Sequence, residues 1–153
     1  MVLNSEIKKA VEESIICWLA TADEHGVPNV SPKEIFTYFG DEEILIANIV
    51  SPGSVRNIEK NQNVCVSFIN VFSQKGFKLK GHAENMIAID KGYKERFDVL
   101  FVMAGERFPI VSVIKIKVHE SEPIVAPSYR LYPDTTEKDQ IESAMQAYGV
   151  KGV

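Results

Sequence analysis

Residues 47–61 constrain the fold most, because an apolar strand there runs straight into a helix through a turn of small residues. The segment reads ANIVSPGSVRNIEKN. The apolar residues up to Val50 predict a buried strand, Ser51-Pro52-Gly53 predict a turn, and the residues that follow predict a helix carrying Arg56. The chain must therefore combine strands with helices that flank them.

This turn has two interpretations that its spacing alone leaves open. In the first it is a phosphate site, because the first N–H groups of a helix lack intrahelical acceptors, and serines with one guanidinium add donors and positive charge. In the second, Ser54 is an N-cap, Pro52-Gly53 is a plain turn and Arg56 is a solvated helix residue.

Charge and length exclude several classes of protein. The chain has 153 residues, of which 17 are basic and 21 acidic, so nothing attracts nucleic acid or an anionic membrane in general. No apolar run approaches the length that spans a bilayer, and no secretory signal opens the chain. We expect a cytoplasmic protein that captures any anion locally.

Cysteine and histidine give little sign of a reactive site. Cys17 and Cys65 lie in apolar runs, which predicts reduced thiols that serve packing. His25, His82 and His119 are scattered, without companion ligands at metal-binding spacing, so we expect no metal site. His82, in the strand segment KGHAE, is either structural or a cleft residue. No catalytic residue can be assigned.

Apolar periodicity predicts six strands and four helices in one domain over residues 1–153. Residues 126–153 form a carboxy-terminal tail, in which Thr136 caps a helix that ends near Tyr148. Ser5 caps the first helix and Asp90 caps the one that Gly105 ends. The predicted strands span residues 15–22, 27–38, 43–49, 64–70, 77–86 and 110–119.

Two of these strands have unusual faces. In residues 27–38, one face carries Asn29, Ser31 and Lys33, which is polar for a barrel wall. The strand at residues 110–119 is apolar on both faces, so another part of the protein must cover it. That excess of apolar surface, with Trp18 and Phe36, predicts a homodimer.

Three segments in this order resemble the pyridoxamine 5'-phosphate oxidase-like FMN-binding proteins. They are LATADEHGVPNVSP (19–32), ILIANIVSPGSVRNIEKNQNVCVSF (44–68) and GFKLKGHAE (76–84), and the resemblance covers roughly residues 5–120. It implies a mainly β protein with flanking helices, built on a six-stranded antiparallel split β-barrel. It also implies a homodimer that binds FMN in two equivalent clefts between the subunits.

The resemblance implies where the cofactor is bound. The phosphate would be held after the third strand and along the second, and the ring would lie near residues 47–49. Carried onto this chain, the cofactor-binding residues are Ser31, Pro32, Lys33, Glu34, Ala47, Asn48, Ile49, Ser51, Ser54, Arg56 and Asn57.

The chain departs from the family in two places. Many relatives have Arg-Lys or Lys just before the helix, where this chain has Gly53-Ser54. The phosphate charge would then rest on Arg56, Lys33, backbone N–H groups and serine hydroxyls. The Arg-rich segment that grips vitamin B6 substrates is not recognisable in PSYRLYPDTTEKDQ, so we do not assign that oxidation.

Three functions follow from these observations. The first is an FMN-dependent oxidoreductase of unknown substrate, in which the flavin carries the chemistry and no acid–base set need appear. The second is a non-catalytic flavin-binding or electron-transfer protein. The third keeps the barrel but binds a deazaflavin or haem, since fold alone does not separate these cofactors.

Overall fold

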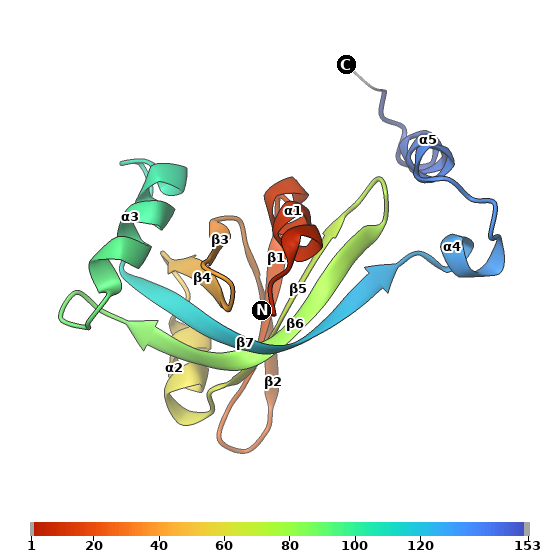
Figure 1. The fold of residues 1–153 in the computed structure, drawn as a ribbon. Coiled ribbons are helices and arrows are strands. Elements are labelled where there is room, and N and C mark those ends of the chain that lie inside the picture. Colours follow the sequence, from red (N-terminus) through yellow and green to blue (C-terminus); the bar gives the residue numbers. More distant parts are fainter. Residues whose placement is uncertain (1, 152–153) are drawn as a thin grey trace.

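The computed structural model describes residues 2–151 and contains one curled antiparallel sheet with helices around it (Figure 1). Its seven strands follow the spatial order β2-β1-β5-β6-β7-β4-β3. The mainly β class with flanking helices and the split barrel are therefore confirmed. The strands are β1 (Cys17–Ala22), β2 (Pro28–Lys33), β3 (Phe36–Phe39), β4 (Glu43–Asn48), β5 (Asn63–Asn70), β6 (Lys75–Met86) and β7 (Ser112–Val125).

The seventh strand arises because the strand predicted at residues 27–38 is broken at Glu34 and Ile35. β2 pairs with β1 at one end of the strand order, whereas β3 pairs with β4 at the other end. The chain thus crosses between the two edges of the sheet within two residues. This crossing joins the edges of the split barrel and replaces six predicted strands with seven.

The main core fills the hollow of the curled sheet, where α1 (Ser5–Glu13) lies (Figure 1). Ile7 and Val11 of α1 are buried there against residues such as Phe68 of β5. A second cluster lies under α3 (Tyr93–Ala104), whose Leu100 packs with Val113 of β7. α3 is therefore the cover that the apolar strand at residues 110–119 requires.

In two helices, α1 and α2, the N-cap is a different residue from the one predicted. Asn4, not Ser5, caps α1, and its side chain accepts a hydrogen bond from the Ile7 N–H. α2 (Pro52–Lys60) has Ser51 as its N-cap, so Ser54 lies inside the helix and is not the cap. Proline suits the first helical position because its missing N–H would have no partner there.

Of the two other predicted helix caps, Asp90 is wrong and Thr136 is confirmed. Asp90 does not cap α3. The N-cap of α3 is Gly92, whose backbone is in the left-handed region, and the Asp90 carboxylate instead accepts a hydrogen bond from the Ile87 N–H in the preceding turn. Thr136 caps α5 (Glu137–Tyr148) as predicted, in a reciprocal box with Asp139.

The carboxy-terminal helices α4 (Pro127–Leu131) and α5 extend away from the sheet at one end of the long β6–β7 ribbon (Figure 1). Three contacts attach them to the turn between β5 and β6. Glu137 pairs with Lys75 at 2.8 Å, the Tyr129 hydroxyl donates to the Ser73 carbonyl at 2.8 Å, and Gln74 donates to the Tyr148 hydroxyl at 3.2 Å.

Candidate functional site

A buried lysine at the end of β2 is the centre of the candidate site. Lys33 is only 7% exposed, and it lies opposite Cys17 of β1 in the sheet register. Its ammonium donates a hydrogen bond to the Ser51 hydroxyl. Within residues 2–151 no carboxylate forms an ion pair with it. A buried cation with only a hydroxyl partner is costly, because the lost hydration is not replaced by an opposite charge.

Lys33 also lies beside the positive end of a helix. Its hydrogen-bond partner Ser51 is the N-cap of α2, and the Ser51 side chain makes no capping bond to the helix N–H groups. Inside the first turn, the Ser54 hydroxyl lies 3.3 Å from the Ser31 hydroxyl of β2. The Lys33 ammonium, the Ser51 hydroxyl and the N-terminus of α2 thus converge, and such an arrangement can bind an anion.

Burial changes the ionisation of both residues in this register pair. Desolvation lowers the pKa of the Lys33 ammonium, and the neighbouring Cys17 opposes that shift. Desolvation raises the pKa of the Cys17 thiol to about 12, against the opposing effect of Lys33. Cys17 is therefore a neutral packing thiol and not a nucleophile.

Lys33 and Ser51 line a cavity of about 660 Å³. Six of the eleven predicted cofactor residues border it, namely Pro32, Lys33, Glu34, Ala47, Ile49 and Ser51. The other lining residues are all apolar. They come from the segment before β1, the β2–β3 crossing, the segment between β4 and α2, and the end of α3 with the residues after it: Ile15, Ile35, Val50, Met103, Ala104 and Phe108.

A second hollow of about 440 Å³ lies against the same chain segment and shares Ile49, Val50 and Ser51 with the first. Arg56, an exposed residue of α2, lines this second hollow and not the one beside Lys33. Asn48 also lines it and donates to the Ser112 hydroxyl at 2.8 Å. Eight of the eleven predicted residues therefore line one or both of two adjoining hollows.

Ser31, Ser54 and Asn57 border neither hollow. Asn57 donates to the buried Thr21 hydroxyl of β1 at 3.0 Å, which ties α2 to the sheet. Sequence reasoning missed Thr21, although it is a polar residue on the same strand face as the buried Leu19 and could have been noticed.

Two apolar residues of the cavity lining could not be found from the sequence. Met103 and Phe108 come from the end of α3 and the segment after it, far along the chain from β2. They reach the cavity only because α3 packs over β4 and β7. Local pattern contains no information on that long-range contact.

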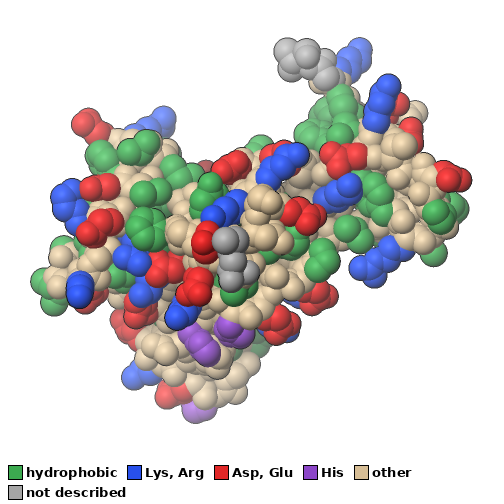
Figure 2. Space-filling model, viewed as in Figure 1, with side chains coloured by type: hydrophobic (Ala, Val, Ile, Leu, Met, Phe, Trp, Pro, Cys, Tyr) green, Lys and Arg blue, Asp and Glu red, His purple; other side chains and the backbone are tan. Residues whose placement is uncertain are grey.

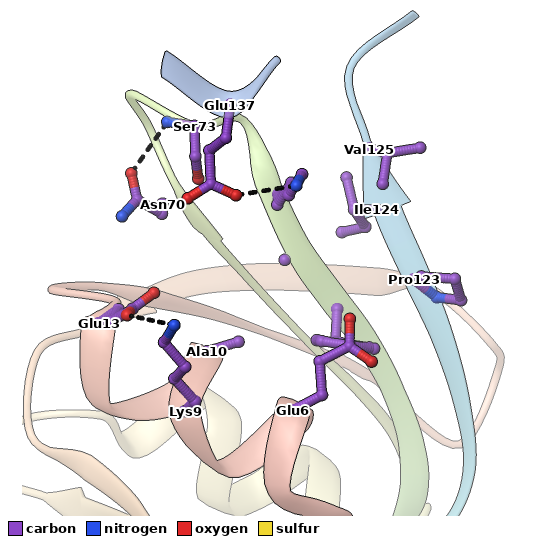
Figure 3. Close-up of a pocket in the computed structure, with 13 residues that line it drawn as sticks. Glu6, Lys9, Ala10, Glu13, Asn70, Ser73, Pro123, Ile124, Val125 and Glu137 are labelled. Carbon is purple, nitrogen blue, oxygen red and sulfur yellow. Dashed lines mark hydrogen bonds and ion pairs between the residues drawn. The ribbon is translucent and has the colours of Figure 1, made fainter. Parts of the chain in front are cut away.

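A third, smaller hollow of about 200 Å³ lies between α1, the β6–β7 ribbon and the start of α5 (Figure 3). Its charged side chains largely satisfy one another, since Glu137 pairs with Lys75 at 2.8 Å and Lys9 with Glu13 at 3.6 Å. The Asn70 carboxamide accepts the Ser73 N–H at 3.1 Å. This hollow therefore offers no uncompensated cation comparable to Lys33.

The fold recurs in several solved structures. Over 81% of this chain and 98% of the other, it matches HupZ from Group A Streptococcus with 21% identity and a TM-score of 0.67. An FMN-binding protein from Syntrophomonas wolfei matches over 79% and 88%, with 15% identity and a TM-score of 0.65. HutZ, the heme storage protein from Vibrio cholerae, matches over 82% and 95%, with 21% identity and a TM-score of 0.61.

Sequence comparison identifies the family. No curated protein matches the chain. The family model described as pyridoxamine 5'-phosphate oxidase matches residues 3–124, which is well over half of the chain. No helix in residues 2–151 is long and apolar enough to cross a membrane. The chain belongs to the pyridoxamine 5'-phosphate oxidase family.

Proposed function

We propose that the cavity beside Lys33 binds FMN and that the protein is a flavin-dependent oxidoreductase of unassigned substrate. The buried ammonium of Lys33, at the positive end of α2 and on the cavity wall, carries this proposal. An anionic ligand there would neutralise a charge that has no carboxylate partner among residues 2–151. The cavity volume of about 660 Å³ lies within the usual range of cofactor sites.

The donors and the apolar walls suit the two ends of a flavin mononucleotide. Lys33, Ser51 and the first N–H groups of α2 would hold the phosphate, with Arg56 approaching from the adjoining hollow. The ring would lie against apolar side chains such as Ile49 and Phe108. FMN supplies the electron or hydride chemistry when bound, and these residues bind and orient it.

Haem is the competing occupant, since HutZ of the same fold is called a heme storage protein. Haem iron takes its axial ligand from His, Cys, Met or Tyr. Met103 is the single side chain of these types that lines the cavity beside Lys33 in the described part of the chain. A buried ammonium and a helix N-terminus are better suited to a phosphate group, so we favour the flavin.

We further propose that the protein acts as a homodimer in which a second copy covers this cavity. Ile15 and Val50 line it and are 81% and 83% exposed, and apolar residues of α3 such as Val102 are also exposed. Apolar surface of this kind at the mouth of a cavity is typical of an interface. Sedimentation should show a dimer at micromolar concentration, and a monomer would refute this assembly.

The test of the cofactor is a binding titration of the purified protein with FMN, riboflavin and haem. Flavin fluorescence and the absorption spectrum report the first two ligands, and a Soret shift reports haem. We expect FMN to bind more tightly than riboflavin, because only FMN carries the phosphate. Equal affinities for the two flavins, or binding of haem alone, would overturn the proposal.

A second measurement separates an enzyme from a carrier. The FMN-loaded protein is mixed with NADH or NADPH and a panel of electron acceptors, and nicotinamide oxidation is followed. Turnover with any donor supports an oxidoreductase. Flavin binding without turnover for any pair supports the non-catalytic flavin-binding or electron-transfer function.

A further inference from the structure

We infer that His82 and His119 form a two-histidine site for a divalent transition-metal ion such as Zn²⁺ or Cu²⁺. The two side chains are exposed, on neighbouring strands β6 and β7, and their ring centroids lie 5.0 Å apart with an interplanar angle of 34°. Figure 2 shows two histidine side chains (purple) next to each other on the lower part of the molecular surface. Imidazole nitrogens are good ligands for both metals.

The ring spacing fits chelation of one ion. With a metal–nitrogen distance of about 2.1 Å, each ring centroid lies about 3.2 Å from the ion, so two rings at a tetrahedral angle are about 5.2 Å apart. The observed separation of 5.0 Å is close to that value. The two rings therefore lie at the separation that chelation of a single ion requires.

A β-bulge positions one of the two ligands. Gly81 pairs with Val118 and Lys80 pairs with Glu120, so His119 is the extra residue of β7 and has no partner on β6. A bulge kinks its strand and changes the direction of the side chain it carries. In this case it lets His119 lie beside His82, although the regular partner of His82 is Lys117.

Gly81 keeps the two strands close at this point. A Cβ atom added there would lie 2.4 Å from the Lys117 carbonyl oxygen, so no other residue fits without moving the backbone. Gly81 immediately precedes His82 in the chain. The glycine and the bulge together fix the backbone positions of both histidines on rigid strands.

The surrounding charges do not oppose a cation, because each nearby lysine is neutralised by a glutamate. Within residues 2–151 no group of three or more His, Cys, Asp or Glu side chains could hold a metal, so water must complete the coordination. We therefore expect an exchangeable site. The neutralised pairs are Lys80 with Glu120 at 2.7 Å, Lys117 with Glu42 at 3.7 Å, and Lys115 with Glu84.

The test is a calorimetric titration of untagged protein with Zn²⁺ and, separately, Cu²⁺. Wild type should bind one ion per chain. His82→Asn and His119→Asn should each weaken binding by at least about tenfold, since each removes one of two ligands. His25→Asn is the matched control, because His25 is exposed in the turn between β1 and β2 and lies on neither β6 nor β7, and its loss should leave binding unchanged.

The outcomes separate this site from general metal binding by exposed histidines. Circular dichroism should show all three variants folded, because the altered side chains are exposed. The inference is wrong if wild type binds neither ion, if either strand variant binds like wild type, or if His25→Asn loses as much affinity as they do. None of these results depends on the flavin, because neither histidine borders the cavity beside Lys33.

Discussion

Replacing Lys33 by methionine should weaken FMN binding while leaving the cofactor-free protein at least as stable as wild type. Lys33 is buried, and in the described part of the chain its ammonium donates to the Ser51 hydroxyl alone. Methionine has a similar length and no charge, so it fills the space without the desolvation cost of an ammonium. A residue retained at a cost to stability is expected where the charge serves a ligand.

The size of both effects can be worked out from these contacts. If the ammonium donates to the phosphate, its removal deletes a charge-assisted hydrogen bond worth about 1.5–3 kcal/mol, which raises the dissociation constant of FMN by about 10- to 150-fold. Riboflavin should lose little further affinity, since it has no phosphate. In a chain of this length, each kcal/mol of relieved desolvation should raise the melting temperature by about 2–4 °C.

The pH dependence of stability gives an independent check. The pKa of Lys33 is lower in the folded protein than in the unfolded chain, where a lysine has a pKa of about 10.4. Between the two values the unfolded state binds more protons, so the free energy of unfolding rises with pH. The cost of burying the charged Lys33 lowers the free energy of unfolding fully below the folded pKa, and it disappears above about pH 10.4. Lys33→Met should lack this rise.

The assay compares wild type, Lys33→Met and Lys60→Met by fluorescence titration with both flavins and by thermal melting. Lys60 is an exposed residue in the last turn of α2 and serves as the matched control. Unchanged FMN affinity in a folded Lys33→Met protein would refute the phosphate role of Lys33. Equal losses for FMN and riboflavin would instead indicate a loosened barrel.

Four further substitutions test other parts of the structure. Arg56→Ala should raise the dissociation constant of FMN by about tenfold, at the low end of the range for such a bond because Arg56 is exposed and its charge is screened, with riboflavin titration as the control. Glu43→Gln should lower the free energy of unfolding by about 1–3 kcal/mol in a denaturant titration, because the carboxamide carries no charge and can accept only one of the two 2.8 Å bonds from Arg96 of α3; an unchanged midpoint would contradict this. Gly76→Ala should unfold at clearly lower denaturant, since its Cβ would lie 2.0 Å from a backbone oxygen, whereas Gly53→Ala, in open space on a helix, should be neutral or stabilising by up to about 1 kcal/mol.

Most elements could be predicted from the sequence because their signals are local. Apolar alternation located β1, β4 and β5 to within two residues, and the strand–turn–helix junction at Ser51 located α2. The strand predicted at residues 110–119 is shorter than β7, because the second half of β7 reads HESEPIV and has little apolar periodicity. That half is a strand because it pairs with β6, where Glu122 meets Lys78 at 2.8 Å. Such a pairing depends on contacts between distant segments.

The break at Glu34 and Ile35 had no local signal, and it decides where the site lies. In one continuous strand, Lys33 and Phe36 would point to opposite faces, since side chains alternate with a period of two. Phe36 is instead buried in the main core that contains Cys17, the register partner of Lys33.

The predicted alternation of side chains is right for residues 29–33, which form one continuous strand up to Lys33. It is wrong beyond the crossing, where the chain joins the other edge of the sheet. The crossing frees the chain after Lys33 from β1 and returns it to the sheet beside β4, with the Ala47 N–H bonded to the Ile35 carbonyl. Lys33 therefore lies at the seam where the two edges of the barrel meet, next to the strand that leads into α2. If residues 27–38 formed one continuous strand, all neighbours of Lys33 would belong to a single edge of the sheet. The ammonium faces the helix N-terminus because of the same irregularity that makes the seventh strand.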